Sequence, residues 1–197
     1  MISSIVLAAG LSTRMGEPKA LLDWGGKPLI CYQVEQLREA GVDEVIVVLG
    51  HRGDDIQRQM RRLACRVMLN PRYYQGRAGS LRIGARAVNR DADAIVIMNV
   101  DQPRPASFIR QLIDAHRPES LGTQPFQGGH HGHPIIVSGS LRGELMEATD
   151  EAGGLAGVLR AHAGELAEWN CDDDLCHLDV NTPADYSEAR KRFGLAS

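Results

Sequence analysis

Short apolar runs alternate with segments of helical spacing along the whole chain, and this alternation constrains the fold more than any other feature. The strand-like runs cover residues 5–9, 44–49, 66–69 and 94–100. Between them, apolar side chains recur every three or four residues, as in residues 28–40, which is the spacing of one helix face. Strands separated by helices form βαβ units with parallel strands. The sequence therefore predicts one Rossmann-like, three-layer α/β/α domain over residues 1–197, with a mostly parallel sheet.

The remaining elements are shorter. Helical spacing returns at residues 56–63, 81–88, 108–113, 141–148 and 155–162, and late strands are expected at 133–137, 166–170 and 175–180. The polar, glycine-rich stretch 124–134 predicts a loop or the tip of a β-ribbon. A last helix is expected to begin at Thr182, a good N-cap that is followed by Pro183 at the first helical position and Asp185 at the third.

The composition is that of an ordinary globular protein and argues against several classes. A net charge of −3 over 197 residues argues against a general nucleic-acid binder, which needs a basic surface. No run approaches the ~18 apolar residues of a membrane span, and no basic segment of a secretory signal precedes the first strand. The four cysteines form no C-x-x-C pair, which is typical of reduced thiols. We therefore expect a cytoplasmic protein.

A loop of small residues follows the first strand and carries two cations. The apolar run breaks at Gly10, and the segment after it holds Arg14, Gly16, Pro18 and Lys19. Because few Cβ atoms stand in the way, the backbone N–H groups of such a loop can approach a polyphosphate closely. The two cations can then neutralise the phosphate charge. An ordinary strand-to-helix turn with two solvated charges explains the same residues, so both interpretations stay open.

A carboxylate stands at the end of a later strand. Asp101 follows the apolar run 94–100, and in open parallel sheets ligands bind beyond the carboxyl ends of the strands. Asp101 is therefore expected at the same edge as the cationic loop. A carboxylate repels a triphosphate unless a divalent cation lies between them, and Mg²⁺ needs few protein oxygens beside phosphate and water. A role as N-cap or turn residue before Pro103 explains Asp101 equally well.

The cationic loop also resembles a family signature. Residues 7–22 read L-A-A-G-x-S-x-R-M-G-x-P-K-A-L-L, which is similar to the signature of nucleotidylyltransferases, in particular the MobA-like group that attaches a nucleotide to molybdopterin. The loop lacks the Lys-Ser or Lys-Thr end of a Walker-type loop and is not G-x-G-x-x-G. The resemblance implies a nucleotide-diphospho-sugar transferase fold with Arg14 and Lys19 at the triphosphate. It places the base against the backbone of four residues, Leu7, Ala8, Ala9 and Gly10.

Further segments match the same family. Asp101 in V-D-Q-P resembles its D-x-P metal motif, and Asn181 in D-V-N-T-P matches a second metal ligand, so the resemblance implies Mg²⁺ on these two residues. Gly79 and Ser80 in G-S-L-R resemble a segment that contacts the base or ribose. His133 in G-H-P resembles an element beside the acceptor pocket.

The residues themselves leave alternatives open. Asn181 also suits a turn before a capped helix, and Ser80 suits an N-cap. His133 lies beside His130 and His131 on a glycine-rich segment, a pattern more typical of a polar tip than of a zinc site.

The resemblance implies an enzyme that moves a nucleoside monophosphate from an NTP to the phosphate of an acceptor and releases pyrophosphate. Arg14, Lys19 and Asp101 would be its catalytic residues. Leu-Ala-Ala-Gly resembles the cytidylyl members, and the Ala9 methyl narrows the base pocket, so the prediction is CTP as donor and molybdopterin as acceptor. The alternatives are a sugar- or alditol-phosphate nucleotidylyltransferase, and a non-catalytic nucleotide- or cofactor-binding accessory protein for a molybdoenzyme client.

Overall fold

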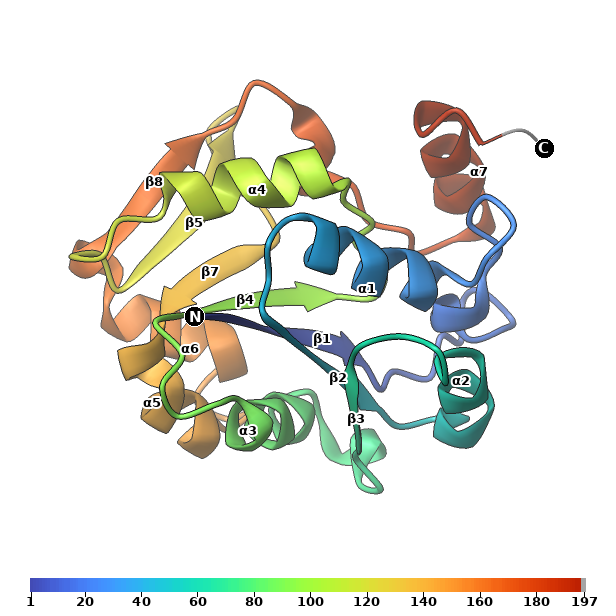
Figure 1. The fold of residues 1–197 in the computed structure, drawn as a ribbon, viewed down its shortest axis with the longest axis horizontal. Coiled ribbons are helices and arrows are strands. Elements are labelled where there is room, and N and C mark those ends of the chain that lie inside the picture. The colour runs from blue at the N-terminus through green and yellow to red at the C-terminus, as the bar shows by residue number, and fades with distance from the viewer. Residues whose placement is uncertain (196–197) are drawn as a thin grey trace.

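A computed structural model describes residues 1–195, and its central sheet lies between two layers of helices (Figure 1). The eight strands follow the order β3-β2-β1-β4-β7-β5-β6, with β8 beside β5. The strands are β1 (Ile2–Ala8), β2 (Glu44–Leu49), β3 (Arg66–Leu69), β4 (Ala94–Asn99), β5 (Gly122–Gln127), β6 (His130–His131), β7 (Ile135–Ser138) and β8 (Leu166–Asn170). The helices are α1 (Leu29–Glu39), α2 (Gly53–Gln59), α3 (Ala78–Ala87), α4 (Ala106–Ala115), α5 (Arg142–Glu147), α6 (Gly154–Ala161) and α7 (Pro183–Arg192). The predicted three-layer α/β/α architecture is confirmed.

The core has one apolar layer on each face of the sheet. Successive strand residues point to opposite faces, so the fully buried neighbours Ile5 and Val6 belong to different layers. Val6 packs with apolar residues of α1, α2 and α4. Ile5 packs with those of α3, α5 and α6. Both faces of the central strands are covered, which is why these strands read as continuous apolar runs.

The central strands are parallel and end at one edge. Strand β1 pairs with β2 on one side and with β4 on the other, and Leu7 lies opposite Val48 and Asn99. The loops after β1 and β4 therefore leave the same edge. Helix α7 lies at this end of the sheet (Figure 1), where its Ala189 packs with Trp24 and other apolar residues.

The second half of the sheet is mixed. Strand β7 is antiparallel to both β4 and β5, whereas β8 is parallel to β5. The stretch 124–134 contains the end of β5 and the short β6, which pair as an antiparallel ribbon. The ribbon interpretation is therefore confirmed.

The prediction of a strand at residues 175–180 is wrong. A short 3₁₀ helix, Asp174–His177, forms there, and residues 178–181 have no regular structure. Asp173 caps the 3₁₀ helix, because its Oδ1 accepts the N–H of Leu175 at 2.9 Å. Such a local side-chain bond competes with strand pairing. The N–H of Val180 donates instead to the carbonyl of Asp101 at 2.8 Å, which draws this segment to the loop after β4.

Two chain-wide expectations can be compared with the structure. All four cysteines are free thiols. Within residues 1–195 no helix is both long enough and apolar enough to cross a membrane.

The expected start of α7 is confirmed as a capping box. The Oγ1 of Thr182 accepts the N–H of Asp185 at 3.2 Å, and Asp185 Oδ2 accepts the N–H of Thr182 at 2.8 Å. The same carboxylate oxygen accepts the N–H of Asn181 at 3.1 Å. These bonds hold the pKa of Asp185 below its usual value. The cap thereby fixes the residue just before the helix.

We expect Thr182→Ala to lower the free energy of unfolding by about 1 kcal/mol, because it leaves a helix N–H without its acceptor. Thr182→Ser keeps the hydroxyl and should stay close to the wild type. Urea denaturation followed by circular dichroism measures both. Equal stabilities of the two variants would contradict the capping argument.

Candidate functional site

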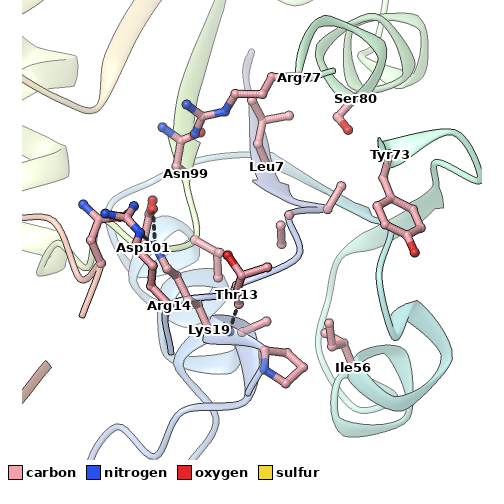
Figure 2. A pocket seen from close by; sticks show the side chains of 18 of the residues that line it. Leu7, Thr13, Arg14, Lys19, Ile56, Tyr73, Arg77, Ser80, Asn99 and Asp101 are labelled. Atoms are coloured by element: carbon pink, nitrogen blue, oxygen red, sulfur yellow. Dashed lines mark hydrogen bonds and ion pairs between the residues drawn. The ribbon is translucent and has the colours of Figure 1, made fainter. Parts of the chain in front are cut away.

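A polar cavity of about 310 Å³ opens at the carboxyl ends of β1 and β4. Three charged side chains, Arg14, Lys19 and Asp101, gather at one end, and Tyr73 and Ser80 lie at the other (Figure 2). A fourth, Arg77, lies between the two ends near Leu7 and Asn99. The remaining walls come from the first strand and its loop, the start of α3 and the loop before α7. The lining residues are Leu7, Ala8, Ala9, Gly10, Ser12, Thr13, Arg14, Pro18, Lys19, Ala20, Ile56, Tyr73, Gly76, Arg77, Ser80, Asn99, Val100, Asp101 and Asn181.

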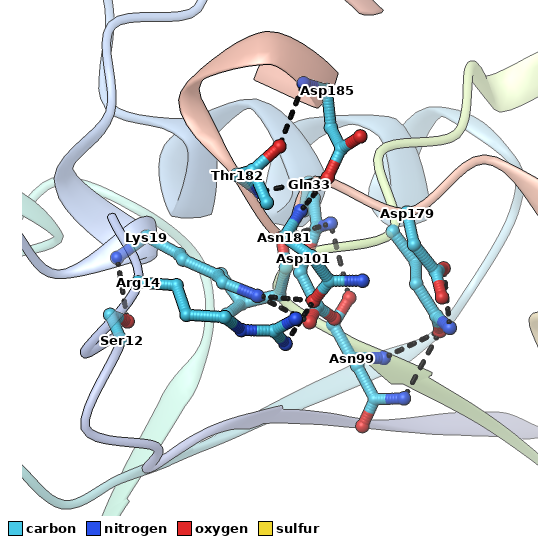
Figure 3. Close-up of polar contacts among 12 residues, drawn as sticks. Ser12, Arg14, Lys19, Gln33, Asn99, Asp101, Asp179, Asn181, Thr182 and Asp185 are labelled. Carbon is cyan, nitrogen blue, oxygen red and sulfur yellow. Dashed lines mark hydrogen bonds and ion pairs between the residues drawn. The ribbon is translucent and has the colours of Figure 1, made fainter.

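One ammonium group joins the charged end. Lys19 Nζ donates to Asp101 Oδ2 at 2.9 Å and to Asn181 Oδ1 at 2.8 Å (Figure 3). Arg14 Nη2 donates to the same Asn181 oxygen at 3.3 Å. The side chains of Lys19 and Asp101 are only 11% and 17% exposed. Three segments that are far apart in the sequence therefore meet at one cation.

The loop after β1 is folded back so that Lys19 reaches this point. Ser12 has a positive φ of 52°, and its Oγ accepts the N–H of Lys19 at 3.0 Å. Gly16, whose φ is +76°, makes the reversal between them without the strain that a side chain would add. The turn interpretation describes the backbone of this loop, and Arg14 is exposed to solvent, but both cations also donate to Asn181.

Asp101 lies in the turn after β4, and this turn contacts the segment that leads to Asn181. Helix α4 begins at Ala106 with Pro105 at its N-cap, so Asp101 is not an N-cap; it lies in the turn after β4. The adjacent Gln102 links this turn to the C-terminal segment, because its Nε2 donates to Asp179 Oδ1 at 3.0 Å.

The donor set at this end fits a hard divalent cation. A carboxylate oxygen of Asp101 and an amide oxygen of Asn181 both face one positive charge, which is the Lys19 ammonium in this structure. Mg²⁺ prefers oxygen ligands and takes few of them from protein when phosphates are present. Within residues 1–195 no group of three or more His, Cys, Asp or Glu side chains could hold a metal. Asp101 and Asn181 remain the predicted ligands.

The predicted nucleotide-binding residues are not all in one place. Leu7, Ala8, Ala9, Gly10 and Ser80 line the cavity, whereas Gly79 does not. Gly79 lines a neighbouring hollow formed mainly by the loop before α3 and the loop after α5.

Ser80 is not the N-cap of α3, so that alternative is wrong. The helix begins two residues earlier, at Ala78, with Arg77 at the N-cap. The Ser80 side chain is buried, and its Oγ accepts a hydrogen bond from Asn70 Nδ2 at 2.9 Å. The O–H of Ser80 therefore keeps its own proton to donate elsewhere.

Arg77 and Tyr73 are cavity residues that the sequence did not reveal. Asp150, from the loop after α5, accepts the N–H groups of Arg77 and Ala78 on Oδ1 at 3.0 and 3.1 Å, and so fixes the start of α3. A Cβ on Gly76 would lie 2.1 Å from Asp150, so only glycine fits there. The glycine before Arg77 was the one visible signal, and nothing in the sequence marks Asp150.

A second cavity, of about 450 Å³, adjoins the first. The two share Leu7, Arg77 and Asn99, and the second also includes Gln124 and His133. Its other walls are largely apolar side chains of β4, β7 and α6.

The predicted acceptor residue His133 lies in this second cavity, away from its two histidine neighbours. Burial lowers the pKa of His133, and the nearby Arg104 charge lowers it too, although Asp179 and Asp101 oppose the shift. Its imidazole is therefore neutral at neutral pH. His130 and His131 are exposed on β6, outside both cavities.

The fold is that of an α/β nucleotide-diphospho-sugar transferase. Residues 4–166 match the model of the MobA-like NTP transferase domain, so the chain belongs to that family of nucleotidyltransferases. The resemblance seen in the loop sequence is thereby confirmed.

Curated relatives and solved structures cover nearly the whole chain. The chain is 25% identical to nicotine blue oxidoreductase from Paenarthrobacter nicotinovorans, over 92% of each chain. It is also 25% identical to molybdenum cofactor cytidylyltransferase from Escherichia coli, over 98% of this chain and 97% of the other. The crystal structure of Rv0371c from Mycobacterium tuberculosis superposes with a TM-score of 0.84 at 29% identity, covering 96% and 97% of the two chains. A manganese complex of that protein superposes with a TM-score of 0.76, also at 29% identity, and covers 95% of this chain and 96% of the other.

We expect Lys19→Met to lower the free energy of unfolding by about 2 kcal/mol while the chain still folds, because it leaves the Asp101 carboxylate largely buried without its cation. The double variant Lys19→Met/Asp101→Asn should regain about 1 kcal/mol of this loss. Chemical denaturation measures both.

Lys27→Met is the matched control. Lys27 pairs with Glu35 on the surface, where the side chains are 44% and 40% exposed, so its loss should have little effect. A double variant as unstable as the sum of its two single variants would show that Lys19 and Asp101 are not coupled.

Proposed function

We propose that the first cavity binds a nucleoside triphosphate and the second binds the acceptor, so that the chain transfers a nucleoside monophosphate and releases pyrophosphate. The observation that carries this proposal is the convergence of Arg14 and Lys19 with the Asp101 and Asn181 oxygens at one end of the cavity. The uncharged end, with Tyr73 and Ser80, suits a base. A nucleotide has this same polarity, with its charge confined to the phosphate tail.

Nucleotidyl transfer requires the protein to position the reactants and to stabilise charge. A phosphate oxygen of the acceptor attacks the α-phosphorus in line with the departing pyrophosphate, and no covalent protein nucleophile is needed. Arg14 and Lys19 bind the phosphate oxygens and stabilise the charge that grows on them in the transition state. Asp101 and Asn181 would hold Mg²⁺, which when bound supplies further positive charge to the phosphates.

The second cavity supports an acceptor of moderate size with polar groups on an apolar body. Gln124, Arg77 and the neutral His133 offer polar contacts, and the walls from β4, β7 and α6 offer apolar ones. Because Leu7, Arg77 and Asn99 line both cavities, acceptor and nucleotide would meet there. The 25% identity to molybdenum cofactor cytidylyltransferase supports molybdopterin as acceptor.

A narrow uncharged end supports CTP as donor. A Cβ on Gly50 would lie 2.6 Å from the Tyr73 Cβ and 2.7 Å from the Ala9 carbonyl, so these three residues are packed as closely as their backbones allow. The Ala9 methyl adds to this restriction. The smaller pyrimidine ring fits such a pocket better than a purine.

We expect Lys19→Ala and Asp101→Ala each to lower kcat by a factor of about 100 or more, because each removes charge stabilisation at the reacting phosphate. Lys27→Ala, a surface lysine variant, should turn over like the wild type. Pyrophosphate release with CTP, Mg²⁺ and molybdopterin is the assay. Wild-type turnover in either site variant would remove that residue from the mechanism.

Calorimetric titration with CTP, GTP, ATP and UTP in the presence of Mg²⁺ tests the base. We expect CTP to bind at least about tenfold more tightly than GTP, since one unfavourable steric contact costs ~1–3 kcal/mol. A preference for GTP would contradict the role of Ala9.

The acceptor needs a separate assay. Pyrophosphate release with sugar phosphates and not with molybdopterin would assign the chain to sugar-phosphate transfer. Nucleotide binding without release for any acceptor would favour a carrier.

A further inference from the structure

Arg104 carries a fully buried charge behind the site. It follows Pro103 in the loop after β4, and its side chain has no exposed surface. Burial lowers the pKa of Arg104 to about 10, while the charges of Asp179 and Asp101 oppose this shift. The side chain is therefore a cation at neutral pH. Among residues 1–195 it forms no ion pair, and its hydrogen bonds all go to backbone carbonyl groups.

The guanidinium group donates to four carbonyl oxygens. Nη1 donates to Pro103 and Leu178 at 2.9 Å each, Nε donates to His133 at 3.0 Å, and Nη2 donates to Cys176 at 3.1 Å. A planar guanidinium can serve several acceptors in fixed directions, which an ammonium on a flexible stem cannot. Removing it would leave three buried or half-buried carbonyls, those of Pro103, Leu178 and His133, without this donor.

These carbonyls belong to three segments that each carry a site residue. One segment is the loop that holds Asp101, another leads through His133 into β7, and the third leads into Asn181. Two backbone bonds complete the junction: His133 N–H donates to Cys176 O at 2.9 Å, and Val180 N–H donates to Asp101 O at 2.8 Å. Arg104 thus stands where the metal-ligand and acceptor segments meet.

The third segment, unlike the other two, does not adjoin a strand of the sheet. The Asp101 loop follows β4 and the His133 segment precedes β7, so the sheet holds both. Residues 178–181 have neither helix nor strand. The packing is also close, because a Cβ on Gly132 would lie 2.6 Å from both the Cβ and the carbonyl oxygen of Cys176.

We propose that Arg104 is a positioning residue: it ties residues 176–178 to the loop after β4, and so helps to set the Asn181 amide oxygen against Asp101 and His133 against the acceptor cavity. The catalytic part of this assignment rests on the proposed nucleotidyl transfer, whereas the structural part does not. Figure 3 shows how closely Asp179 and Asn181 lie to the Asp101 loop that Arg104 secures.

The test compares Arg104→Gln with Arg142→Gln. Arg142 also donates to two backbone carbonyls, those of Val88 and Arg86, but far from the site. Hydrogen exchange is followed at the amides of His133 and Val180. In Arg104→Gln both amides should exchange at least about tenfold faster than in the wild type, because their segments are released locally. In Arg142→Gln they should not change.

A second set of measurements addresses the site. With CTP present, Mn²⁺ binding followed by electron paramagnetic resonance should weaken about tenfold in Arg104→Gln, and kcat should fall by a similar factor or more, because a misplaced ligand is costly. The KM for CTP should stay within about threefold, since the loop of Arg14 and Lys19 makes no bond to Arg104. If Arg104 only stabilised the fold, Arg104→Gln would lower thermal stability without this selective loss of Mn²⁺ binding and kcat at a nearly unchanged KM.

Arg104→Lys covers the case in which Arg104→Gln does not fold. Lysine keeps the charge but reaches fewer of the carbonyls. The exchange rates, the Mn²⁺ affinity and kcat of Arg104→Lys should therefore lie between those of the wild type and those expected for Arg104→Gln. Unchanged exchange at His133 and Val180 in a folded Arg104 variant overturns the proposal. So does faster exchange with unaltered Mn²⁺ binding and kcat. If the wild type binds neither CTP nor Mn²⁺, the proposed function fails, and the exchange data still decide whether Arg104 ties the segments together.

Discussion

The ammonium of Lys19 is the contact on which the site depends. It donates to the carboxylate of Asp101 after β4 and to the amide oxygen of Asn181 before α7. Lys19 itself lies in the loop that follows the neighbouring strand, β1. Without a cation between them, the two oxygen groups would face each other in a largely buried place at a desolvation cost. Parallel pairing of β1 with β4 brings the two strand tips together, and the capped start of α7 fixes Asn181. The sheet therefore brings the segments together, and the hydrogen bonds of the Lys19 ammonium link them.

The two cavities differ in the side chains that line them. The first gathers Arg14, Lys19 and Asp101 at one end, and the second combines polar groups with apolar walls. They meet at Leu7, Arg77 and Asn99, of which Leu7 and Asn99 lie opposite each other on β1 and β4. The backbone of Arg77 is fixed by Asp150 from a distant loop, which accepts its N–H. If the two cavities bind nucleotide and acceptor as proposed, a side chain common to both can contact both reactants.

The sequence predicted what depends on strand order and periodicity. Parallel strands must end together, so Lys19 and Asp101 could be placed at one edge before the fold was known. Residues fixed by distant loops could not be found: Asp150 sets the start of α3 at Ala78, and for that reason the alternative of Ser80 as an N-cap could not be excluded from the sequence. The strand expected at 175–180 failed because Asp173 caps a 3₁₀ turn locally. The predicted role of Asn181 as a metal ligand came from a family motif alone, since its position depends on contacts between distant segments.

The charges of the site favour a polyanion over a bare metal ion. Arg14 and Lys19 contribute two positive charges against the one negative charge of Asp101, and Asn181 contributes an oxygen without charge. A free divalent cation would meet net repulsion there, whereas a triphosphate would meet net attraction. An aspartate at position 181 would cancel that excess and improve the site for metal alone. The asparagine therefore argues that any metal at this site is best accommodated together with the phosphates that offset its charge.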